Sequence, residues 1–404
     1  MSPTGENEQA GNEQAGNEQA RWPFRLYDTA RQAVVPFEPG APRGGTVTMY
    51  TCGITPYDAA HLGHAATYLA YDVLRRRLHD LGYRTKLVRN VTDVDDDILR
   101  KARELGVHYL DLAAEEMARF SADMDALGLL PAEAEPRATS AIHDILRHIG
   151  VVLEKGHAYQ AGGAVYFDVS SWPGFGSVSH YRRDEMLAFA RERGGNPDDP
   201  NKNSPLDFVL WQPSRPDEPV WASRWGPGRP GWHIECSALV LRELGTTIDL
   251  HGGGSDLIFP HHECEAAQSE AATGEKLARH WVHTGMACYE GTKMSKSLGN
   301  LVFVHDLLKK WEPAAVRLAL LAHRYREDWC WEDDLAAEAA DRLARWRASA
   351  AGRGGGSAGL MAEVRAALDD DLDTPRALAA VDTAAGAGGG EGVAGAAALL
   401  GVAL

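Results

Sequence analysis

The sequence lacks long apolar runs and has no segment of the kind that directs export. No stretch of about 18 or more apolar residues occurs among its 404 residues, so no membrane-crossing helix is expected. The first 20 residues are polar and acidic, without the basic start and apolar stretch of a secretory signal. These features predict a cytoplasmic protein with no membrane partner.

Basic residues and cysteines are also scarce. Lys and Arg number 41 against 57 Asp and Glu, which gives a formal net charge of −16. Broad binding to nucleic-acid backbones needs Lys and Arg to release counterions, so no such partner is expected, although local basic patches are not excluded. The five cysteines are odd in number and far apart, which argues against a disulfide framework. Cys288 and Cys330 are therefore expected to be buried small apolar residues.

The order of patterns along the chain predicts an α/β fold. Residues 46–52 and 84–92 are typical of strands, and residues 65–80 between them have the apolar spacing of a helix. Such a βαβ unit implies a parallel sheet with a right-handed crossover. A similar order recurs with a strand at 247–250, a helix from about Pro260 to Ala272 and a strand at 280–289.

The remaining segments predict how the chain is divided. Residues 1–20 repeat the pentad NEQAG and cannot form a core, and residues 193–230 are rich in Gly, Pro, Asn and Asp, which is typical of loops. The chain is mostly helical in pattern from Asp306 onward. We expect a Rossmann-like doubly wound parallel sheet with an insertion and a C-terminal helical domain. The predicted parts are a disordered tail at 1–20, a catalytic domain at 21–120 and 231–305, an insertion at 121–230 and the helical domain at 306–404.

Two short motifs carry groups that suit phosphate chemistry. HLGH places His61 and His64 where a strand turns into a helix, and a helix N-terminus attracts anions. TKMSKSLGN places Lys293 and Lys296 on a glycine-bounded loop, where two ammonium groups can neutralise a developing pyrophosphate. Taken alone, the first motif fits capping or core histidines equally well, and the second fits an exposed basic loop.

The stretch HGGGSDLIFPHHECE, residues 251–265, suits a ligand that approaches the backbone closely. Glycines after a strand permit that approach, and the carboxyl end of a strand is where doubly wound sheets bind ligands. Asp256 would accept hydrogen bonds from a ribose or an amine. The alternative is a tight structural turn.

A dispersed set of donors suits a metal ion. Cys52, Cys236 and His261 offer thiolates and an imidazole, which zinc prefers, and Glu265 shares a helix face with His261. Spacing alone does not establish the set, because Cys52 is far from Cys236 in the sequence. The rival donors from the same stretch are His262, Glu263 and Cys264.

The motifs CGITPYD, HLGH, NVTDVDD, GWHIECSA, HGGGSDLIFPHHE and KMSKSLGN occur in this order. Together they closely resemble the class I aminoacyl-tRNA synthetases, and GWHIEC with the HHE helix resembles the cysteinyl branch. The resemblance covers about residues 22–330. It implies a Rossmann-like domain that binds cysteine and ATP, with Mg²⁺ accompanying the ATP, and one zinc ion held by Cys52, Cys236, His261 and Glu265.

The resemblance also implies roles for other residues. His61, His64, Lys293 and Lys296 would be catalytic, and Trp232 would line the cysteine pocket. The residues expected to bind cysteine, ATP or the adenylate are Cys52, Gly53, Ile54, Thr55, Thr67, Asn90, Val91, Thr92, Trp232, Gly254, Ser255 and Asp256.

Two departures from the synthetases point to a related family. Little chain follows the lysine loop to serve as an anticodon-binding region, and Ala66 in HAATY replaces the usual arginine. The sequence resembles the synthetase-derived ligases of mycothiol biosynthesis, which join cysteine to glucosaminyl-inositol. ERGGNP at 192–197 is similar to their ERGGDP, and Asn196 leaves the role of that motif open.

We therefore expect an ATP-dependent ligase that forms cysteinyl-adenylate and transfers the cysteine to the amine of glucosaminyl-inositol. Its partners would be these small molecules, without nucleic acid. The alternatives are a tRNA-charging cysteinyl synthetase and a catalytically inactive paralogue. The sequence does not choose His64 or Asp256 as the base of the second step, nor does it reveal the oligomeric state, for which a monomer is the working expectation.

The acidic run at Asp93 and Asp95–Asp97 is expected to cap the following helix rather than to bind a second metal ion.

Overall fold

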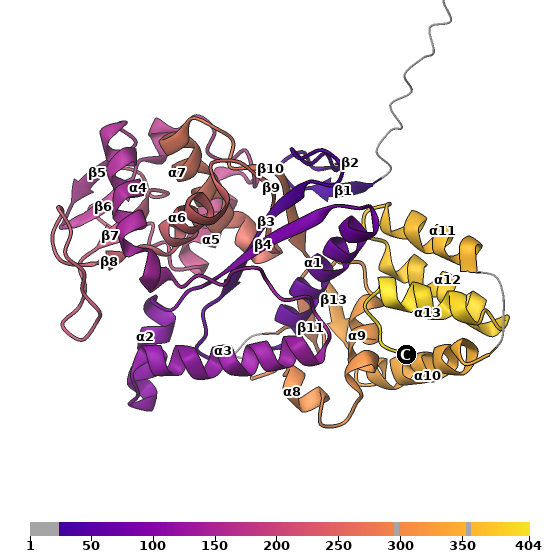
Figure 1. Ribbon diagram of the computed structural model, residues 1–404. Helices are drawn as coiled ribbons and strands as arrows, with labels where there is room; N and C mark the ends of the chain where they lie inside the picture. Colours follow the sequence, from indigo (N-terminus) through magenta and orange to yellow (C-terminus); the bar gives the residue numbers. More distant parts are fainter. Residues whose placement is uncertain (1–23, 295–298, 353–356) are drawn as a thin grey trace, which may run out of the picture.

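The computed structural model describes residues 24–294, 299–352 and 357–404. The tail expected at 1–20 and the predicted catalytic residue Lys296 lie outside these ranges. Lys293 is described by its backbone only. Figure 1 shows a central sheet between a lobe formed by the inserted segment and a group of C-terminal helices.

A four-stranded parallel sheet forms the centre, which confirms the predicted α/β fold. Its strand order is β10-β9-β3-β4, and β3 pairs with both β4 and β9. The chain therefore proceeds outward from the middle of the sheet in both directions, and the crevice between β3 and β9 is a topological switch point. Ligands bind in such crevices at the carboxyl ends of the strands. The strands are β3 (Thr46–Ile54), β4 (Arg84–Val91), β9 (Ile248–Gly254) and β10 (Ala278–Thr284).

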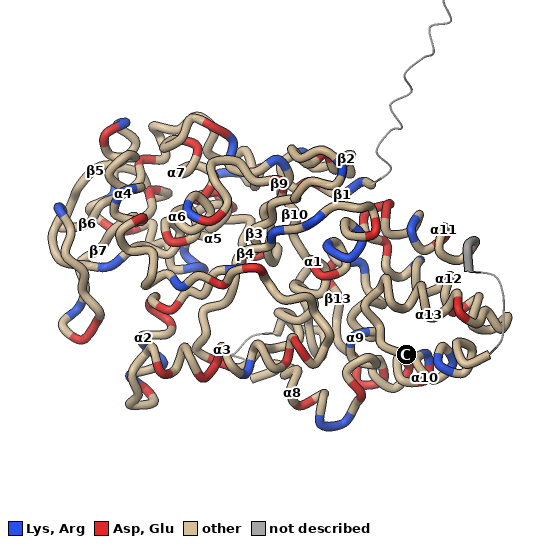
Figure 2. The backbone as a smooth tube through the Cα atoms, in the orientation of Figure 1, with Lys and Arg blue, Asp and Glu red and all other residues tan. Residues whose placement is uncertain are grey.

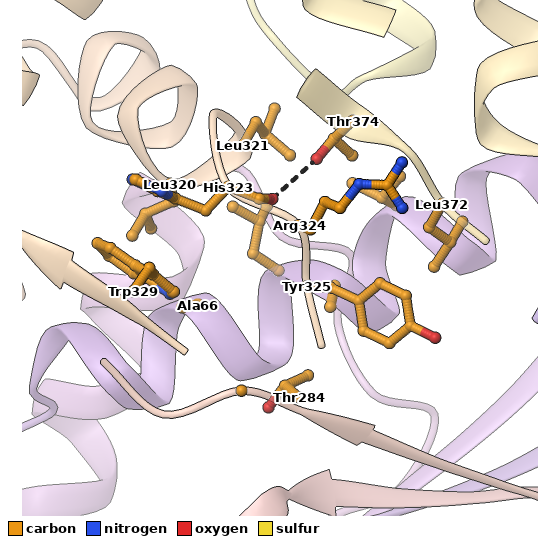
Figure 3. A pocket seen from close by; sticks show the side chains of 14 residues that line it. Ala66, Thr284, Leu320, Leu321, His323, Arg324, Tyr325, Trp329, Leu372 and Thr374 are labelled. Carbon is orange, nitrogen blue, oxygen red and sulfur yellow. Dashed lines mark hydrogen bonds between the residues drawn. The ribbon is translucent and has the colours of Figure 1, made fainter. Parts of the chain in front are cut away.

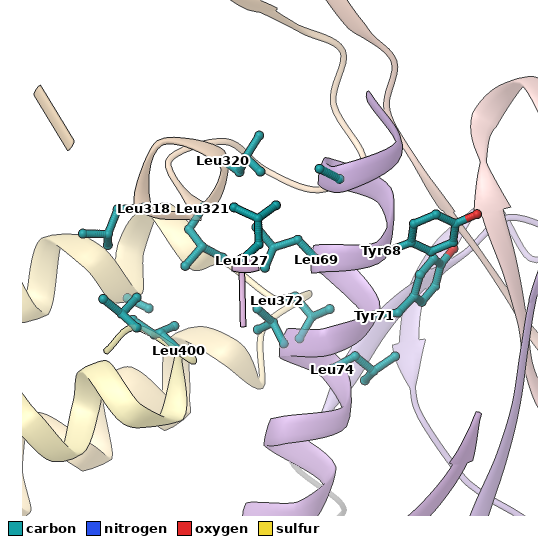
Figure 4. Close-up of a cluster of buried hydrophobic side chains, with 14 of the residues drawn as sticks. Tyr68, Leu69, Tyr71, Leu74, Leu127, Leu318, Leu320, Leu321, Leu372 and Leu400 are labelled. Atoms are coloured by element: carbon teal, nitrogen blue, oxygen red, sulfur yellow. The ribbon is translucent and has the colours of Figure 1, made fainter. Parts of the chain in front are cut away.

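Helix α1 (Leu62–Asp80) connects β3 to β4 and anchors the C-terminal helices. Leu69 and Leu74 of α1 lie with Leu318 and Leu321 of α9 (Pro313–Leu321) in a cluster of buried side chains (Figure 4). The buried Arg317 of α9 adds an ion pair to Asp72 of α1. Burial of apolar surface on both sides of α1 joins the sheet to the helical region.

The segment between β4 and β9 forms the lobe beside the sheet. An antiparallel sheet of order β5-β6-β7-β8 lies within it. The prediction of loop structure over 193–230 is wrong at β7 and β8, because Leu210 and Trp211 are fully buried although Gly and Pro surround them. The elements of this segment are α2 (Asp96–Leu105), α3 (Tyr109–Ala126), η1 (Ala138–Ala141), α4 (Ile142–Glu154), β5 (Ala158–Ala161), β6 (Ala164–Phe167), η2 (Val169–Ser171), α5 (Arg183–Glu192), β7 (Phe208–Gln212), β8 (Arg229–Pro230) and α6 (Trp232–Leu244).

The predicted capping of the helix after the acidic run is confirmed. Asp95 is the N-cap of α2 and accepts a hydrogen bond from the backbone N–H of Ile98 at 2.9 Å. Asp93 accepts instead from the backbone N–H and the hydroxyl of Thr139.

The C-terminal region is mostly helical, as predicted, but it contributes one strand that the sequence did not indicate. Its elements are α8 (Val304–Leu307), α9 (Pro313–Leu321), β13 (Trp329–Trp331), α10 (Leu335–Ala350), α11 (Ser357–Leu368), α12 (Thr374–Gly386) and α13 (Glu391–Leu399). Among the described helices, none combines the length and apolar character needed to cross a bilayer.

The predicted strand at 280–289 is divided in two. β10 ends at Thr284, and β11 (Ala287–Tyr289) belongs to a second sheet with β12 (Thr292–Lys293) and β13. At Gly285 a side chain would lie 2.1 Å from the carbonyl oxygen of Glu327, so only glycine fits where the chain changes sheet.

The expectation of two buried free thiols at Cys288 and Cys330 is wrong. The parallel pairing of β11 with β13 sets these residues opposite each other, and they form a disulfide in a half-buried position. A separation of 42 residues gave no local sign of that pairing.

Candidate active site

The predicted metal donors converge at the switch point, although they come from four different elements. Cys52 lies near the end of β3, Cys236 in α6, His261 in η4 (Ile258–His262) and Glu265 in α7 (Glu263–Thr273). One donor atom from each lies within 4.8 Å of the others. The two sulfur atoms are 3.9 Å apart, and Nε2 of His261 is 3.0 Å from a carboxylate oxygen of Glu265. All four side chains are at most 5% exposed.

Two further histidines adjoin this donor cluster. Nε2 of His251 is 3.1 Å from the second carboxylate oxygen of Glu265, and Nε2 of His262 is 3.2 Å from the sulfur of Cys52. A second group of donors, Cys52, His251, His262 and Glu265, therefore also lies within 4.8 Å. His251 had not been singled out from the sequence, although it opens the HGGG motif at the end of β9.

The other two rival donors take no part in either group of the described residues. Glu263 accepts hydrogen bonds from the backbone N–H groups of Gly176 at 2.7 Å and Ser179 at 2.8 Å, so its carboxylate holds a loop of the inserted segment. Cys264 is buried, and burial raises the pKa of its thiol well above its usual value.

The pKa shifts favour the ionised, cation-binding form at Cys236 and Glu265, whereas those of Cys52 and His261 favour the protonated forms. Burial alone would raise the pKa of the Cys236 thiol, but the hydrogen bond with Cys52 and the neighbouring His261 bring that pKa down to about 6. Burial, followed by contact with Cys236 and Glu265, raises the pKa of Cys52. His251 and His261 hold the pKa of Glu265 below its usual value despite burial. A thiolate and a carboxylate thus face each other within a shielded space.

Trp232 lies against this cluster from the first residue of α6. Its ring stacks on the ring of His261, with centroids 4.0 Å apart and planes at 29°. The other ring nitrogen of His261 is 2.9 Å from Nδ1 of His233. These contacts fix the orientation of the His261 imidazole, as the outer neighbours of metal-bound histidines do in other proteins.

The HLGH histidines lie at the start of α1. His61 is the N-cap residue, and its ring stacks on that of His64 with centroids 3.8 Å apart. Both side chains are half-buried. The N–H of Leu62 donates to the Val302 carbonyl at 2.8 Å and that of His64 to the His61 carbonyl at 3.0 Å, so α1 offers an anion its helix dipole and the two stacked imidazoles.

Other predicted ligand-binding residues frame the crevice on the side of β4. Gly53 donates its backbone N–H to the side-chain oxygen of Asn90 at 2.8 Å, and the amide of Asn90 donates to Thr92. A side chain at position 53 would lie 1.7 Å from the Asn90 carbonyl, so glycine is required there. Thr55 donates to the Asp95 carboxylate at 2.9 Å. Ile54 and Val91 are register partners at the ends of β3 and β4.

On the opposite side, the glycine run ends β9 and leads into η3 (Ser255–Leu257). At Gly254 a side chain would meet a carboxylate oxygen of Asp256 at 2.6 Å, so Asp256 folds back toward the strand end. Thr67 of α1 and Thr284 of β10 share a hydrogen bond of 2.9 Å nearby. The structure therefore brings most predicted ligand-binding residues to one edge of the sheet.

The strand that precedes the lysine loop lies next to this edge. Lys293 belongs to β12, whose partner β11 follows β10 directly. The structure places the backbone of Lys293 in this small sheet, and it describes neither the side chain nor Lys296.

Ala66, the position that departs from the synthetase pattern, lines a small cavity of about 30 Å³. The cavity lies between α1 and the loop after α9, with Thr284, His323 and Trp329 among its other walls (Figure 3). The His323 and Trp329 rings stack with centroids 4.1 Å apart. C-terminal residues therefore cover the space beside Ala66.

Acidic and basic positions alternate over the molecule. Figure 2 shows them interspersed along α3, where Arg119 pairs with Glu115, and along α10, whose Arg342 pairs with Asp382 of α12. Basic side chains that are already paired with carboxylates attract a polyanion such as a nucleic acid only weakly.

Comparison with known proteins assigns the fold and the family. The structure is similar to the methionyl-tRNA synthetase of Mycobacterium tuberculosis in complex with methionyl-adenylate, with a TM-score of 0.62, 18% identity and coverage of 85% of this chain and 82% of the other. It is similar, with a TM-score of 0.62 and 12% identity, to the leucyl synthetase in a ternary complex from Agrobacterium radiobacter K84, over 91% of this chain and 83% of that one. These likenesses confirm the class I synthetase catalytic fold.

The family model for the class I (C) tRNA synthetase catalytic domain matches residues 40–341. The chain belongs to this family. A Thermobispora bispora protein named L-cysteine:1D-myo-inositol 2-amino-2-deoxy-alpha-D-glucopyranoside ligase is 50% identical over 369 residues, which is 91% of each chain. A Mycobacterium ulcerans protein of the same name is 50% identical over 364 residues, 89% of this chain and 88% of that protein. Family and relatives together identify an ATP-dependent ligase.

Proposed function

We propose that the protein activates L-cysteine with ATP as cysteinyl-adenylate and transfers the cysteine to the amine of glucosaminyl-inositol, a step of mycothiol biosynthesis. The observation that carries this proposal is the meeting of Cys52, Cys236, His261 and Glu265 at the switch point of a synthetase fold. The names of relatives that match about nine-tenths of the chain support the choice of acceptor.

The donor cluster fits one zinc ion. Two sulfurs, an imidazole and a carboxylate are buried with their donor atoms within 4.8 Å of one another, and Nε2 of His261 lies 3.0 Å from a carboxylate oxygen of Glu265. Soft sulfur and imidazole donors are the set that zinc prefers. Cys52, Cys236, His261 and Glu265 would hold the ion, and zinc would supply a Lewis acid with affinity for the cysteine thiolate.

Such a site explains how cysteine is selected. A pocket that recognises shape alone separates similar side chains by only about 1–3 kcal/mol, and serine differs from cysteine by one atom. Trp232 and His261 form the wall against which the substrate side chain would lie. The protein thus orients the amino acid by its sulfur and leaves the carboxylate directed toward the crevice.

In the first step the cysteine carboxylate attacks the α-phosphate of ATP, and pyrophosphate leaves. His61 and His64 donate to phosphate oxygens at the start of α1, and Lys293 and Lys296 neutralise the leaving pyrophosphate, with Mg²⁺ bound to ATP. The binding energy of these groups acts through positioning and charge stabilisation. Gly53, Thr55, Asn90 and Asp256 hold the adenylate in the crevice, as do the remaining predicted ligand-binding residues.

In the second step the sugar amine attacks the carbonyl carbon of the adenylate, the amide forms and AMP leaves. Asp256 or His64 accepts the proton that the amine loses. We propose that both steps take place in a catalytic domain formed by residues 21–120 and 231–305. The other proposed parts are an insertion at 121–230 and a helical domain at 306–404.

The acceptor decides between this proposal and tRNA charging. Zinc-loaded protein should exchange pyrophosphate into ATP only when cysteine is present, and it should form the cysteinyl amide when glucosaminyl-inositol is added. Cysteine-accepting tRNA should remain uncharged. Charging of the tRNA without amide formation would establish the cysteinyl synthetase instead, and absence of exchange would indicate an inactive paralogue.

A further inference from the structure

The segment ERGGNP ends helix α5 in a shape that its residues dictate. Arg193 is the C-cap residue, Gly194 has a left-handed φ of 80°, and the N–H of Gly195 bonds to the carbonyl of Ala190 at 2.7 Å. Glycine after a helix end satisfies free carbonyl groups in this way. The two glycines therefore stop α5 directly after Arg193.

Asn196 continues the turn with a φ of 41°, which is also left-handed. Asn and Asp are the non-glycine residues that adopt this conformation most readily. The conformation therefore explains why asparagine can stand where the related ligases have aspartate.

The Arg193 guanidinium reaches out of the inserted segment to the end of the glycine-rich stretch. One of its terminal nitrogens donates to the carbonyl oxygens of both Asp256 and Phe259. The central carbon of the guanidinium, Cζ, lies 4.5 Å from the ring centroid of Phe189, which is one helical turn earlier in the chain. The aromatic face on one side and two carbonyls on the other fix the guanidinium in place.

These two carbonyls bound the segment that connects two parts of the site. Asp256 lies in η3, directly after β9, among the predicted ligand-binding residues, and Phe259 has the extended angles φ −142° and ψ 136° where two helical turns meet. His261 of the donor cluster follows two residues later. One cation therefore joins the carbonyl groups at the two ends of residues 256–259.

We propose that Arg193 is a positioning residue for the reaction, holding residues 256–259 so that Asp256 faces the adenylate. This inference rests on the proposed function. Arg193 is not required to attach the inserted segment, because Glu263 separately binds the backbone of Gly176 and Ser179. Loss of Arg193 should therefore disturb the 256–259 segment without releasing the lobe.

The test compares Arg193→Ala and Arg193→Lys with the matched control Arg191→Ala. Arg191 belongs to the same helix, is exposed and pairs with Asp198 at 3.2 Å. Zinc-loaded proteins are assayed for cysteine-dependent pyrophosphate exchange and for amide formation with glucosaminyl-inositol. Zinc content, the thermal midpoint and hydrogen exchange of peptides that cover residues 252–262 are measured on the same preparations.

Arg193→Ala should lower kcat/KM at least about tenfold, because small displacements of positioning groups are costly in rate. Hydrogen exchange at 252–262 should become at least about fivefold faster, with zinc content and thermal midpoint close to wild type. Arg193→Lys, which can still donate to the carbonyls, should recover most of the rate. Arg191→Ala should match wild type throughout.

Kinetics of Arg193→Ala that equal those of Arg191→Ala would overturn the inference. So would a joint loss of zinc, stability and activity that lysine does not rescue, since this pattern indicates a general structural role. If wild-type protein neither exchanges pyrophosphate nor forms the amide, the proposed function fails, whereas unchanged hydrogen exchange at 252–262 in Arg193→Ala rejects the contact itself.

Discussion

The two ends of the crevice differ in how they are built. The donor cluster of Cys52, Cys236, His261 and Glu265 is almost fully buried, and its side chains contact one another. The HLGH end has two half-buried histidines stacked at a helix start. In the proposed reaction, the buried end would choose the amino acid before the chemistry begins. The open end suits groups that meet a large, charged nucleotide and then release its products.

The difference implies that selection and activation can be separated by experiment. A change at the buried end should remove metal and cysteine recognition together. A change at the open end should slow the chemistry and leave the metal in place.

The largest effect is expected for Cys236→Ala. The variant should lose its zinc, and its rate of cysteine-dependent pyrophosphate exchange should fall at least about a hundredfold. Even the outer neighbours of metal ligands commonly contribute ten- to a hundredfold to metal affinity or activity. Elemental analysis and the exchange assay measure both. Cys264→Ala is the matched control, since Cys264 is equally buried but belongs to neither donor group. Full zinc content in Cys236→Ala would remove that residue from the site.

At the open end, His64→Ala should lower the exchange rate about a hundredfold with unchanged zinc content, since removal of one charge-stabilising donor typically has this effect. His79→Ala provides the control, because His79 lies exposed at the other end of the same helix. Loss of zinc from His64→Ala would show that the two ends are not independent.

A smaller effect is expected next to the donor cluster. His251 contacts the carboxylate of Glu265, so His251→Ala should weaken zinc binding ten- to about a hundredfold without abolishing it. Competition with a chelator measures the affinity. The buried His148 lies outside both donor groups and bonds to the Gln268 carbonyl, so His148→Ala should bind zinc as wild type does. Equal affinities in the two variants would assign His251 no part in metal binding.

The smallest effect concerns the contribution of the helix cap at Asp95 to stability. Burial raises the pKa of Asp95 to about 6, from a usual value of 3.8. A raised carboxyl pKa means that the folded state binds more protons than the unfolded state between these values, so stability falls as pH rises from about 4 to 6.

Asp95→Asn keeps the cap but cannot ionise, because asparagine caps helices about as well as aspartate. The variant should gain about 1–3 kcal/mol over wild type at pH 7 and show a flatter profile between pH 4 and 6. Urea unfolding at several pH values measures the difference, with zinc content unchanged. A variant less stable than wild type at pH 7 would contradict the assignment.

The sequence predicted what depends on local pattern. The strand, helix and strand of residues 46–91, the cap at Asp95 and the parallel sheet follow from periodicity and capping chemistry. Motif order also supplied the four members of the donor cluster before the structure brought them together.

What the sequence missed depends on long-range packing. The pairing of Cys288 with Cys330, the burial of β7 and the contact of His251 with Glu265 each join residues whose proximity only the folded chain sets. The reach of Arg193 to Asp256 and Phe259 crosses from the inserted segment to the sheet. No local spacing encodes such contacts, so pattern alone could not assign them.

The most direct test is X-ray absorption at the zinc edge, recorded on the loaded protein with and without amino acids. Two sulfur ligands should be present in the free protein, and a third should appear with cysteine but not with serine. A spectrum that cysteine leaves unchanged, or a protein that takes up no zinc, would contradict recognition of the substrate through its sulfur.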